Sequence, residues 1–177
     1  MKGLTHLYYG DGKGKTTAAL GLALRAAGFG KSIVIVQFLK HWKTGELKAL
    51  AQIPNIRIIR NEPFSGEGKF LHEMNEEEKA LLKIRHDESF QKALLLQRDG
   101  LCDMLILDEV VEAYQHGVLD FKAFEELLEN KPDDLELVLT GHLPDAWILE
   151  KADYLTEMIK RKHPYDSGIA ARAGIEY

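Results

Sequence analysis

The segment Gly10-Asp11-Gly12-Lys13-Gly14-Lys15-Thr16-Thr17 is the strongest indication of fold and chemistry in this sequence. It lies between an apolar run at 4–9 and a helical pattern that extends from Lys15 to Ala27. Glycines let the backbone curl so that its N–H groups converge, and the start of a helix adds partial positive charge. Lys15 and the hydroxyl of Thr16 suit a phosphate chain and its Mg²⁺. The segment therefore predicts a phosphate-binding loop between a buried strand and a helix.

This loop departs from the strict phosphate-loop pattern. That pattern places a glycine five residues before Gly14, where this sequence has Tyr9. The additional glycines at 10 and 12 indicate a variant loop that holds its nucleotide in an unusual pose. A glycine-rich turn with a helix cap would give a similar sequence, but the strand–loop–helix context favours the phosphate loop.

Outward from the loop, apolar β-type runs alternate with helical patterns. Strands are predicted at 4–9, 32–38, 56–59, 104–107, 135–140 and 154–159. Helices are predicted at 15–27, from a capping box of Asn75 and Glu78 to about Arg98, at 121–129, and from Pro144 in a first helical turn. This alternation predicts an α/β fold, a single P-loop NTPase domain over 1–177, with a mostly parallel sheet and helices on both faces.

A second motif follows the strand at 104–107, where Asp108-Glu109 ends an apolar run. Ligands of parallel sheets bind beyond the carboxyl ends of the strands, so these acids are expected beside the phosphate loop, where one of them can hold Mg²⁺. A solvated strand end would also explain the pair. Gln37, Phe38 and Lys40 end another strand at the same edge, and an ordinary strand end with a solvated lysine would explain them equally well. Thr140-Gly141-His142 ends a third strand, where a turn is the usual explanation and contact of His142 with phosphate is the alternative.

Composition narrows the function classes. The 177 residues carry a formal net charge of −5 and a pI of about 5.8, which argues against a nucleic-acid partner. No apolar run reaches the roughly 18 residues of a membrane span, and a single cysteine fits a cytoplasmic location. That residue, Cys102, is expected to be a buried small hydrophobe. The seven histidines show no close metal-ligand spacing, so no zinc site is predicted.

Several segments together resemble one known family. They are GDGKGKTTAALGLALRAAGFGK, VIVQFLK, W-x-x-GE, LILDEV, LTG and the closing KHPYDSGIAARAGIEY. These look like the P-loop ATP:corrinoid adenosyltransferases, which act on cob(I)yrinic acid a,c-diamide or cob(I)alamin. The similarity extends from Gly3 to Tyr177, and its most specific parts are the glycine–lysine loop and the closing segment.

The resemblance implies a RecA-like fold, a homodimer, and transfer of the 5′-deoxyadenosyl group of ATP to Co(I) of a reduced corrinoid, with release of triphosphate. It also implies Mg²⁺ or Mn²⁺, ATP bound in a reversed sense, and an electron-donating reductase such as a flavodoxin or flavoprotein. The biological setting would be adenosylcobalamin biosynthesis or salvage.

The resemblance also implies roles for individual residues. Lys15, Thr16 and Glu109 would be catalytic, and Thr16, Asp108 and Glu109 would hold the metal. The ATP-binding residues would be Gly10, Asp11, Gly12, Lys13, Gly14, Lys15, Thr16, Thr17 and Arg25. Trp42, Phe64 and Phe70 are candidates for packing on the corrin, because aromatic rings can stack on a large flat ligand.

Two alternatives remain open at this point. A P-loop kinase or RecA-like ATPase would use the same loop and acids, with Glu109 as base, and would release ADP instead of triphosphate. A nucleotide-sensing module would bind ATP without turnover. Neither alternative requires the closing segment from Lys162 to Tyr177.

Overall fold

The computed structural model describes residues 2–40, 44–60 and 69–176. Within these ranges one sheet contains β1 (Thr5–Tyr9), β2 (Ile33–Gln37), β3 (Ile56–Arg60), β4 (Met104–Asp108), β5 (Glu136–Gly141) and β6 (Tyr154–Glu157). The strand order is β3-β2-β4-β5-β1-β6, and every pair of neighbours is parallel. The predicted parallel sheet is confirmed.

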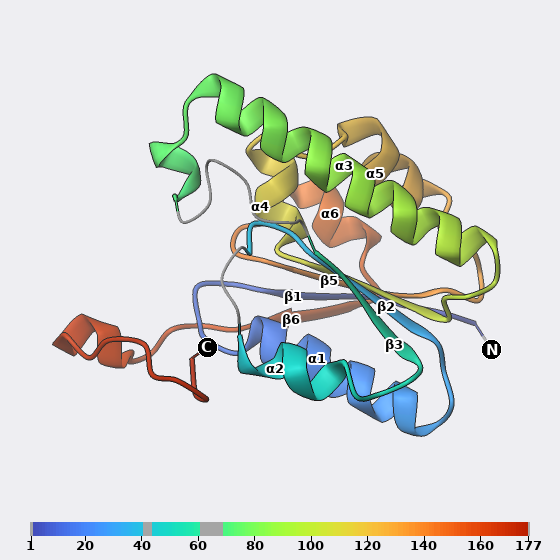
Figure 1. Cartoon of the computed structure of the whole chain (residues 1–177), viewed down its shortest axis with the longest axis horizontal. Coiled ribbons are helices and arrows are strands. Elements are labelled where there is room, and N and C mark those ends of the chain that lie inside the picture. Colours follow the sequence, from blue (N-terminus) through green and yellow to red (C-terminus); the bar gives the residue numbers. More distant parts are fainter. Residues whose placement is uncertain (1, 41–43, 61–68, 177) are drawn as a thin grey trace.

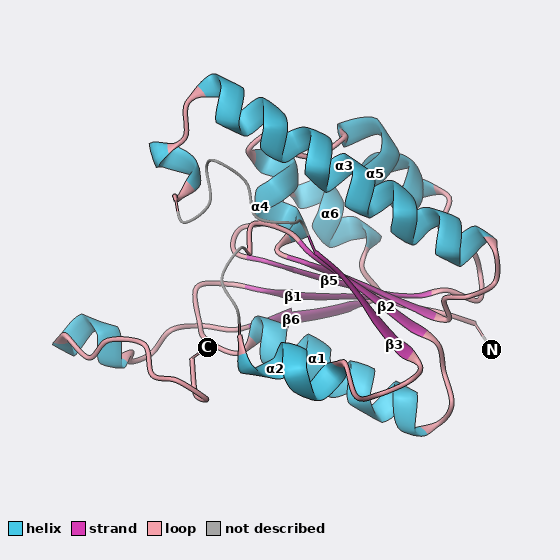
Figure 2. Cartoon of the chain, in the orientation of Figure 1, coloured by secondary structure: helices cyan, strands magenta, loops and turns pink. Residues whose placement is uncertain are grey.

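Helices cover both faces of the sheet (Figures 1 and 2). On one face lie α1 (Lys15–Gly28) and α2 (Gly45–Leu50), and on the other α3 (Glu76–Arg98), α4 (Val110–Gln115), α5 (Phe121–Glu129) and α6 (Ala146–Lys151). Two 3₁₀ turns, η1 (Leu71–Glu73) and η2 (Pro164–Ser167), complete the described elements. None of the described helices is both long and apolar enough to cross a membrane.

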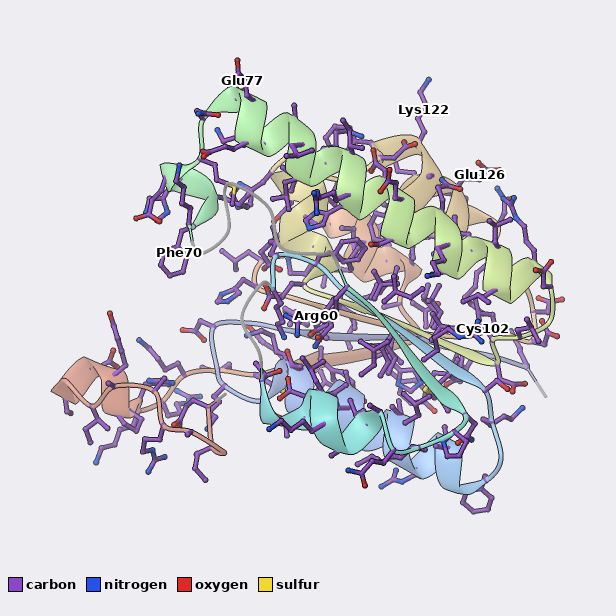
Figure 3. All side chains as sticks on the ribbon, in the orientation of Figure 1. Arg60, Phe70, Glu77, Cys102, Lys122 and Glu126 are labelled. Atoms are coloured by element: carbon purple, nitrogen blue, oxygen red, sulfur yellow. The ribbon has the colours of Figure 1, made fainter. Side chains whose placement is uncertain are left out.

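The two faces of the sheet bury two hydrophobic clusters. Every residue of β2 and β4 is buried, as expected of strands covered on both sides. Ala19 and Ala23 let α1 lie close to the sheet on one face, while Phe90 of α3 packs against Phe38 on the other. Cys102 is buried, as predicted, at the end of the sheet remote from Phe70 (Figure 3).

Local sequence signals located several elements correctly. Asn75 caps α3: its side chain accepts from the N–H of Glu78, whose carboxylate accepts from the N–H of Asn75. The predicted helix at 121–129 is confirmed. The placement of Pro144 was wrong: Asp145 is the N-cap of α6, so the proline precedes the helix instead of lying in its first turn.

Strand order determines where the site can form. Because all strands are parallel, their carboxyl ends share one edge of the sheet, and ligands bind there. β5 lies between β1, which leads into the glycine–lysine loop, and β4, which ends at Asp108. In the ladder Gln37 pairs with Asp108, and Tyr9 pairs with Gly141. The ends of four strands thus bring the candidate residues together, in agreement with the expected RecA-like P-loop arrangement.

Candidate active site

The glycine–lysine loop follows β1 and begins α1, as predicted. Gly14 is the N-cap of the helix at φ 112°, a left-handed conformation that glycine adopts without steric cost. The N–H groups of Lys13, Gly14 and Lys15 donate to no other residue of the described chain. Free N–H groups at the start of a helix are suited to an anion.

The N–H groups of Gly10 and Gly12, unlike those of Lys13, Gly14 and Lys15, are bonded to other parts of the protein. They donate to the carbonyls of His142, at 2.8 Å, and Met158, at 2.6 Å. A Cβ at Gly10 or Gly12 would lie only 2.4 or 2.6 Å from the Met158 oxygen. Because these glycines have no side chain, Met158, which directly follows β6, can pack against the loop and hold it in place. Asp11 serves the same purpose, because its carboxylate accepts from the N–H of Lys160 at 2.9 Å.

We expect Gly12→Ala to displace the loop from its support and to destabilise the fold by about 1–3 kcal/mol, since the clash is with backbone atoms. ATP affinity should fall with it. Thermal unfolding and ATP titration measure the two effects. Gly28→Ala is the matched control, because a Cβ at Gly28 meets nothing within 4 Å. Equal behaviour of the two variants would contradict this account of the loop.

The two lysines of the loop have different partners. Lys15 Nζ lies over the loop, 2.7 Å from the Gly10 oxygen and 3.0 Å from the Gly12 oxygen, and burial lowers its pKa. Lys13 Nζ instead contacts Glu176 Oε1 at 3.0 Å. Hydrogen bonds from Arg172 and then from Lys13 lower the pKa of Glu176 to about 2, so this carboxylate is charged at neutral pH. The closing segment thus returns to the phosphate loop.

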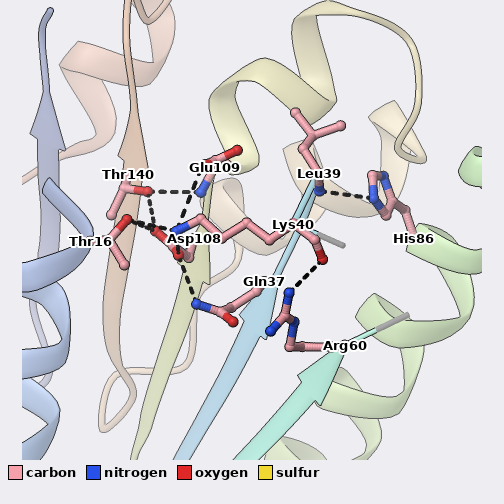
Figure 4. A network of polar contacts seen from close by, with 9 residues as sticks. All are labelled: Thr16, Gln37, Leu39, Lys40, Arg60, His86, Asp108, Glu109 and Thr140. Carbon is pink, nitrogen blue, oxygen red and sulfur yellow. Dashed lines mark hydrogen bonds and ion pairs between the residues drawn. The ribbon is translucent and has the colours of Figure 1, made fainter. Parts of the chain in front are cut away.

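Asp108 is the centre of a buried polar network (Figure 4). It is 1% exposed. Its Oδ1 accepts from the hydroxyls of Thr16, at 2.9 Å, and Thr140, at 2.8 Å. Its Oδ2 accepts from Gln37 Nε2 at 3.2 Å and from Lys40 Nζ at 2.5 Å. Four donors therefore converge on one carboxylate, from the start of α1, from β5 and from the end of β2 with the residues that follow it.

Glu109 lies directly beside this network. Its backbone has φ 61°, unusual for a residue with a side chain, and its N–H donates to Thr140 Oγ1 at 2.8 Å. Burial, together with the negative charges of Asp108 and Glu112, raises the pKa of Glu109 to about 7 despite the attraction of Lys40. The sequence predicted neither the backbone conformation nor this pKa.

The three predicted metal ligands thus lie together. Thr16, Asp108 and Glu109 offer hydroxyl and carboxylate oxygens, which are the donors that Mg²⁺ and Mn²⁺ prefer. No group of three or more His, Cys, Asp or Glu side chains with metal-binding geometry occurs in the described chain. Two carboxylates and one hydroxyl leave further positions around Mg²⁺ that phosphate oxygens and water can fill.

A cleft of about 960 Å³ opens in front of the loop. Its lining combines the glycine–lysine loop, an apolar wall from α1 and α2, acids from α4 and the closing segment. The residues that line it are Gly12, Lys13, Gly14, Lys15, Thr16, Thr17, Leu20, Gly21, Leu24, Lys40, Thr44, Gly45, Glu46, Ala49, Glu109, Glu112, Gly141, His142, Gly174, Ile175 and Glu176. Its size and its mixture of cationic and apolar walls suit a nucleoside triphosphate.

Two polar atoms in this cleft were not identified from the sequence. Thr44 Oγ1 and Glu112 Oε2 are buried and have no hydrogen-bond partner among the described residues. Buried polar groups normally have partners, so both are available to a ligand. Glu112 follows Glu109 by three residues and lines the same cleft, a spacing that could have indicated it. Thr44 directly follows residues 41–43, which lie outside the described ranges, and no motif in the sequence indicated that it belongs to the site.

Two other predicted residues, Arg25 and Phe70, do not line this cleft. Arg25 lies about 15 Å along the axis of α1 from Lys15, near Tyr8, and does not line the described cleft. Phe70 is 61% exposed and stacks on His72 at a ring separation of 5.8 Å (Figure 3). Trp42 and Phe64 lie outside the described residues. The roles assigned to these four residues stay predictions.

The parallel sheet, the glycine–lysine loop at the start of α1 and the carboxylate at the end of β4 define a P-loop nucleotide-binding domain. The family model described as ATP:corrinoid adenosyltransferase BtuR/CobO/CobP matches residues 1–177. The chain belongs to this family.

Individual relatives agree with the family model. The corrinoid adenosyltransferase of Escherichia coli K12 is 32% identical over 182 residues, covering 99% of this chain and 86% of the relative. Corrinoid adenosyltransferase CobA of Salmonella typhimurium LT2 is also 32% identical, over 177 residues with the same coverage. The corrinoid adenosyltransferase of a Sinorhizobium species is 33% identical, covering 99% of this chain and 81% of that protein.

One solved structure, the ADP form of the Aeropyrum pernix ORC2 protein, has a TM-score of 0.39 and 16% identity to this chain. The matched region covers 91% of this chain and 43% of the ORC2 chain. A likeness at this level does not bear on the function.

Proposed function

We propose that this protein transfers the 5′-deoxyadenosyl group of ATP to the Co(I) ion of a reduced corrinoid and releases triphosphate, in adenosylcobalamin biosynthesis or salvage. The observation that carries the proposal is the family match over residues 1–177, which includes the closing segment. That segment and the glycine–lysine loop are the most specific parts of the resemblance, and Glu176 of the segment contacts Lys13 of the loop. We further propose that 1–177 act as one domain.

Transfer of the adenosyl group requires no general acid or general base from the protein. Co(I) is a strong nucleophile: its electron pair forms the bond to C5′ of ATP, the bond from C5′ to the bridging oxygen breaks, and triphosphate leaves with those electrons. Cobalt is oxidised from Co(I) to Co(III) in this step. The protein must align cobalt, C5′ and the leaving oxygen, a form of positioning that can contribute about 7–11 kcal/mol.

The protein must also stabilise negative charge that grows on the leaving triphosphate. We assign this to Lys15, Lys13 and the free N–H groups at the start of α1. Thr16, Asp108 and Glu109 would hold Mg²⁺ or Mn²⁺, which neutralises phosphate charge when it is bound. Asp11 contributes by holding the loop against Lys160, instead of by contact with the phosphates, which its negative charge would repel.

An anaerobic assay tests the proposal. The protein is mixed with chemically reduced cobalamin, ATP and Mg²⁺, the corrinoid spectrum is followed, and the phosphate product is identified. An adenosylated, light-sensitive corrinoid with released triphosphate is expected. Release of ADP without a cobalt–carbon bond would instead indicate a kinase or ATPase, and tight ATP binding without any product would indicate a nucleotide sensor.

The difficult step before transfer is reduction to Co(I), and we propose that aromatic side chains of the 61–73 segment displace water or base from the lower face of cobalt. Phe70, the candidate that lies within the described residues, is exposed and stacks on His72. Phe70→Ala should lower activity from Co(II) corrinoid with a reductant several-fold, and should leave activity from prereduced Co(I) nearly unchanged. Phe29→Ala, at another exposed phenylalanine, is the control. Unchanged activity from Co(II) would exclude a role for Phe70.

Three further proposals rest on the family resemblance alone. They are a homodimer, a flavodoxin or another flavoprotein as electron donor, and a role for Arg25 at the nucleotide. Sedimentation analysis tests the first, and reconstitution of Co(II) reduction with a purified flavodoxin tests the second. A change in ATP affinity of Arg25→Ala tests the third.

A further inference from the structure

The ammonium group of Lys40 contacts the three side chains that are the proposed metal ligands. Its Nζ is 2.5 Å from Asp108 Oδ2, 2.9 Å from Thr16 Oγ1 and 3.5 Å from Glu109 Oε1 (Figure 4). Its side chain is only 10% exposed. A lysine ammonium is charged at neutral pH, and this one pairs with the carboxylates of both Asp108 and Glu109.

The backbone that carries Lys40 is held from two sides. Leu39 has φ 57°, a strained conformation for a leucine, and its N–H donates to His86 Nε2 at 3.2 Å. The carbonyl of Lys40 accepts from Arg60 at 2.8 Å. Residues from α3 and β3 thus determine where this side chain begins.

His86 is suited to this role because it is buried and neutral. Its Nδ1 lies 2.8 Å from the Val118 carbonyl, so this nitrogen carries the proton and Nε2 is left as the acceptor for Leu39. Burial lowers the pKa of His86 to about 4. Phe38 packs its ring edge-to-face against the imidazole at 5.1 Å. The position of Lys40 is therefore built by the fold and is not that of a loose surface lysine.

Two cations cannot share these oxygens. A magnesium ion would lie about 2.0–2.1 Å from its ligands. An ammonium within 2.5–3.5 Å of the same three side chains would then lie only a few ångströms from the metal. In a site of low solvent exposure such repulsion is weakly screened. Lys40 must move before a metal binds directly.

A triphosphate changes this balance. Lys40 lines the same cleft as Lys15, Gly14 and Thr17 of the phosphate loop. A lysine has a flexible stem of four carbons, so its ammonium can exchange carboxylate oxygens for nearby phosphate oxygens without movement of the backbone. When the metal binds together with ATP, the ammonium of Lys40 can therefore pair with the phosphates instead of the carboxylates. When the metal binds alone, Lys40 has no such alternative partner.

We propose that Lys40 is an internal cation that prevents free divalent metal from binding to Thr16, Asp108 and Glu109. Its ammonium moves away from these side chains only when a metal–ATP complex binds. The inference rests on the metal site assigned under the proposed function. It adds an order of binding: the metal enters with the nucleotide. It also makes Lys40 a phosphate contact once ATP is bound.

The test measures binding of Mn²⁺ to the protein without nucleotide, from the electron paramagnetic resonance signal of free Mn²⁺. Lys40→Gln removes the charge but retains hydrogen-bond donors for Asp108, and Lys40→Met is a second neutral variant. Both should bind Mn²⁺ at least about tenfold more tightly than the unaltered protein, because the competing charge is gone. With ATP present, this advantage should shrink.

Controls separate the charge from other effects. Lys31→Gln makes the same substitution at a lysine that pairs with Asp103 instead, and should bind Mn²⁺ like the unaltered protein. Lys40→Arg retains the charge and should also exclude Mn²⁺. In the double variant Lys40→Gln, Asp108→Asn the additional Mn²⁺ binding should be lost.

Equal Mn²⁺ affinity of folded Lys40→Gln or Lys40→Met and the unaltered protein would overturn the inference. Additional binding that survives Asp108→Asn would also overturn it, because the metal would then lie elsewhere. The measurement needs no corrinoid, so it is independent of the adenosylation assay. Failure of that assay would remove the proposed reaction but would leave the Mn²⁺ result, and the exclusion of free metal, standing.

Discussion

Replacement of Lys15 by alanine is expected to lower kcat/KM for ATP by about 10²- to 10³-fold, which is the effect of removing one preorganised group from a developing negative charge. The Lys15 ammonium lies within 3.0 Å of two carbonyls of the phosphate loop, so its charge is held where a triphosphate would lie. Because the charge on the triphosphate grows during transfer, kcat should fall as well as ATP affinity. Steady-state kinetics with Co(I) corrinoid measures both.

The matched control is Lys122→Ala. Lys122 is an exposed residue of α5 that projects away from the sheet (Figure 3), and its loss should leave kinetics and stability near their original values. A near-normal kcat/KM for Lys15→Ala would refute the assignment of this loop to the triphosphate.

Asp108→Asn is expected to abolish most activity and to destabilise the protein by about 3 kcal/mol or more. The carboxylate is buried, pairs with Lys40 at 2.5 Å and accepts from two threonine hydroxyls. Removal of one partner of a buried ion pair leaves the other charge uncompensated, which is costlier than loss of a surface pair. Denaturant unfolding measures the stability, and Mn²⁺ binding in the presence of ATP measures the loss of the metal site.

Asp103→Asn provides the comparison, at an aspartate just before the strand that Asp108 ends. Asp103 immediately precedes β4, at the opposite edge of the sheet, and pairs with the half-exposed Lys31 at 3.2 Å. Its replacement should cost no more than about 1 kcal/mol from the ion pair, since solvent screens it. Activity and metal binding should persist in Asp103→Asn. Similar unfolding curves for the two variants would contradict the central position given to Asp108.

The network around Asp108 shows why both effects should be large. This carboxylate joins the phosphate loop through Thr16, the end of β5 through Thr140 and the end of β2 through Gln37. A change at one member leaves buried polar atoms of the others unpaired. Stability and chemistry therefore depend on the same residues at this edge of the sheet.

Local patterns in the sequence determined the elements and the phosphate loop. The continuous apolar runs of β2 and β4, the Asn75–Glu78 cap and the glycines between β1 and α1 each act over a few residues, so their physical effect can be recognised from spacing alone. The short helices α2 and α4 were not predicted, because six residues give too little periodicity and neither helix is preceded by a proline, as α6 is.

The tertiary structure alone decided which distant residues meet. Lys40 reaches Asp108, 68 positions along the chain, and Lys13 reaches Glu176, 163 positions along. Met158 supports Gly12 only because β6 lies beside β1. Such contacts depend on strand order and register, which hydrophobic periodicity does not specify. The sequence by itself thus determined a phosphate loop, a parallel α/β fold and two acids beside it, and the packing of the sheet decided that a buried lysine lies on those acids.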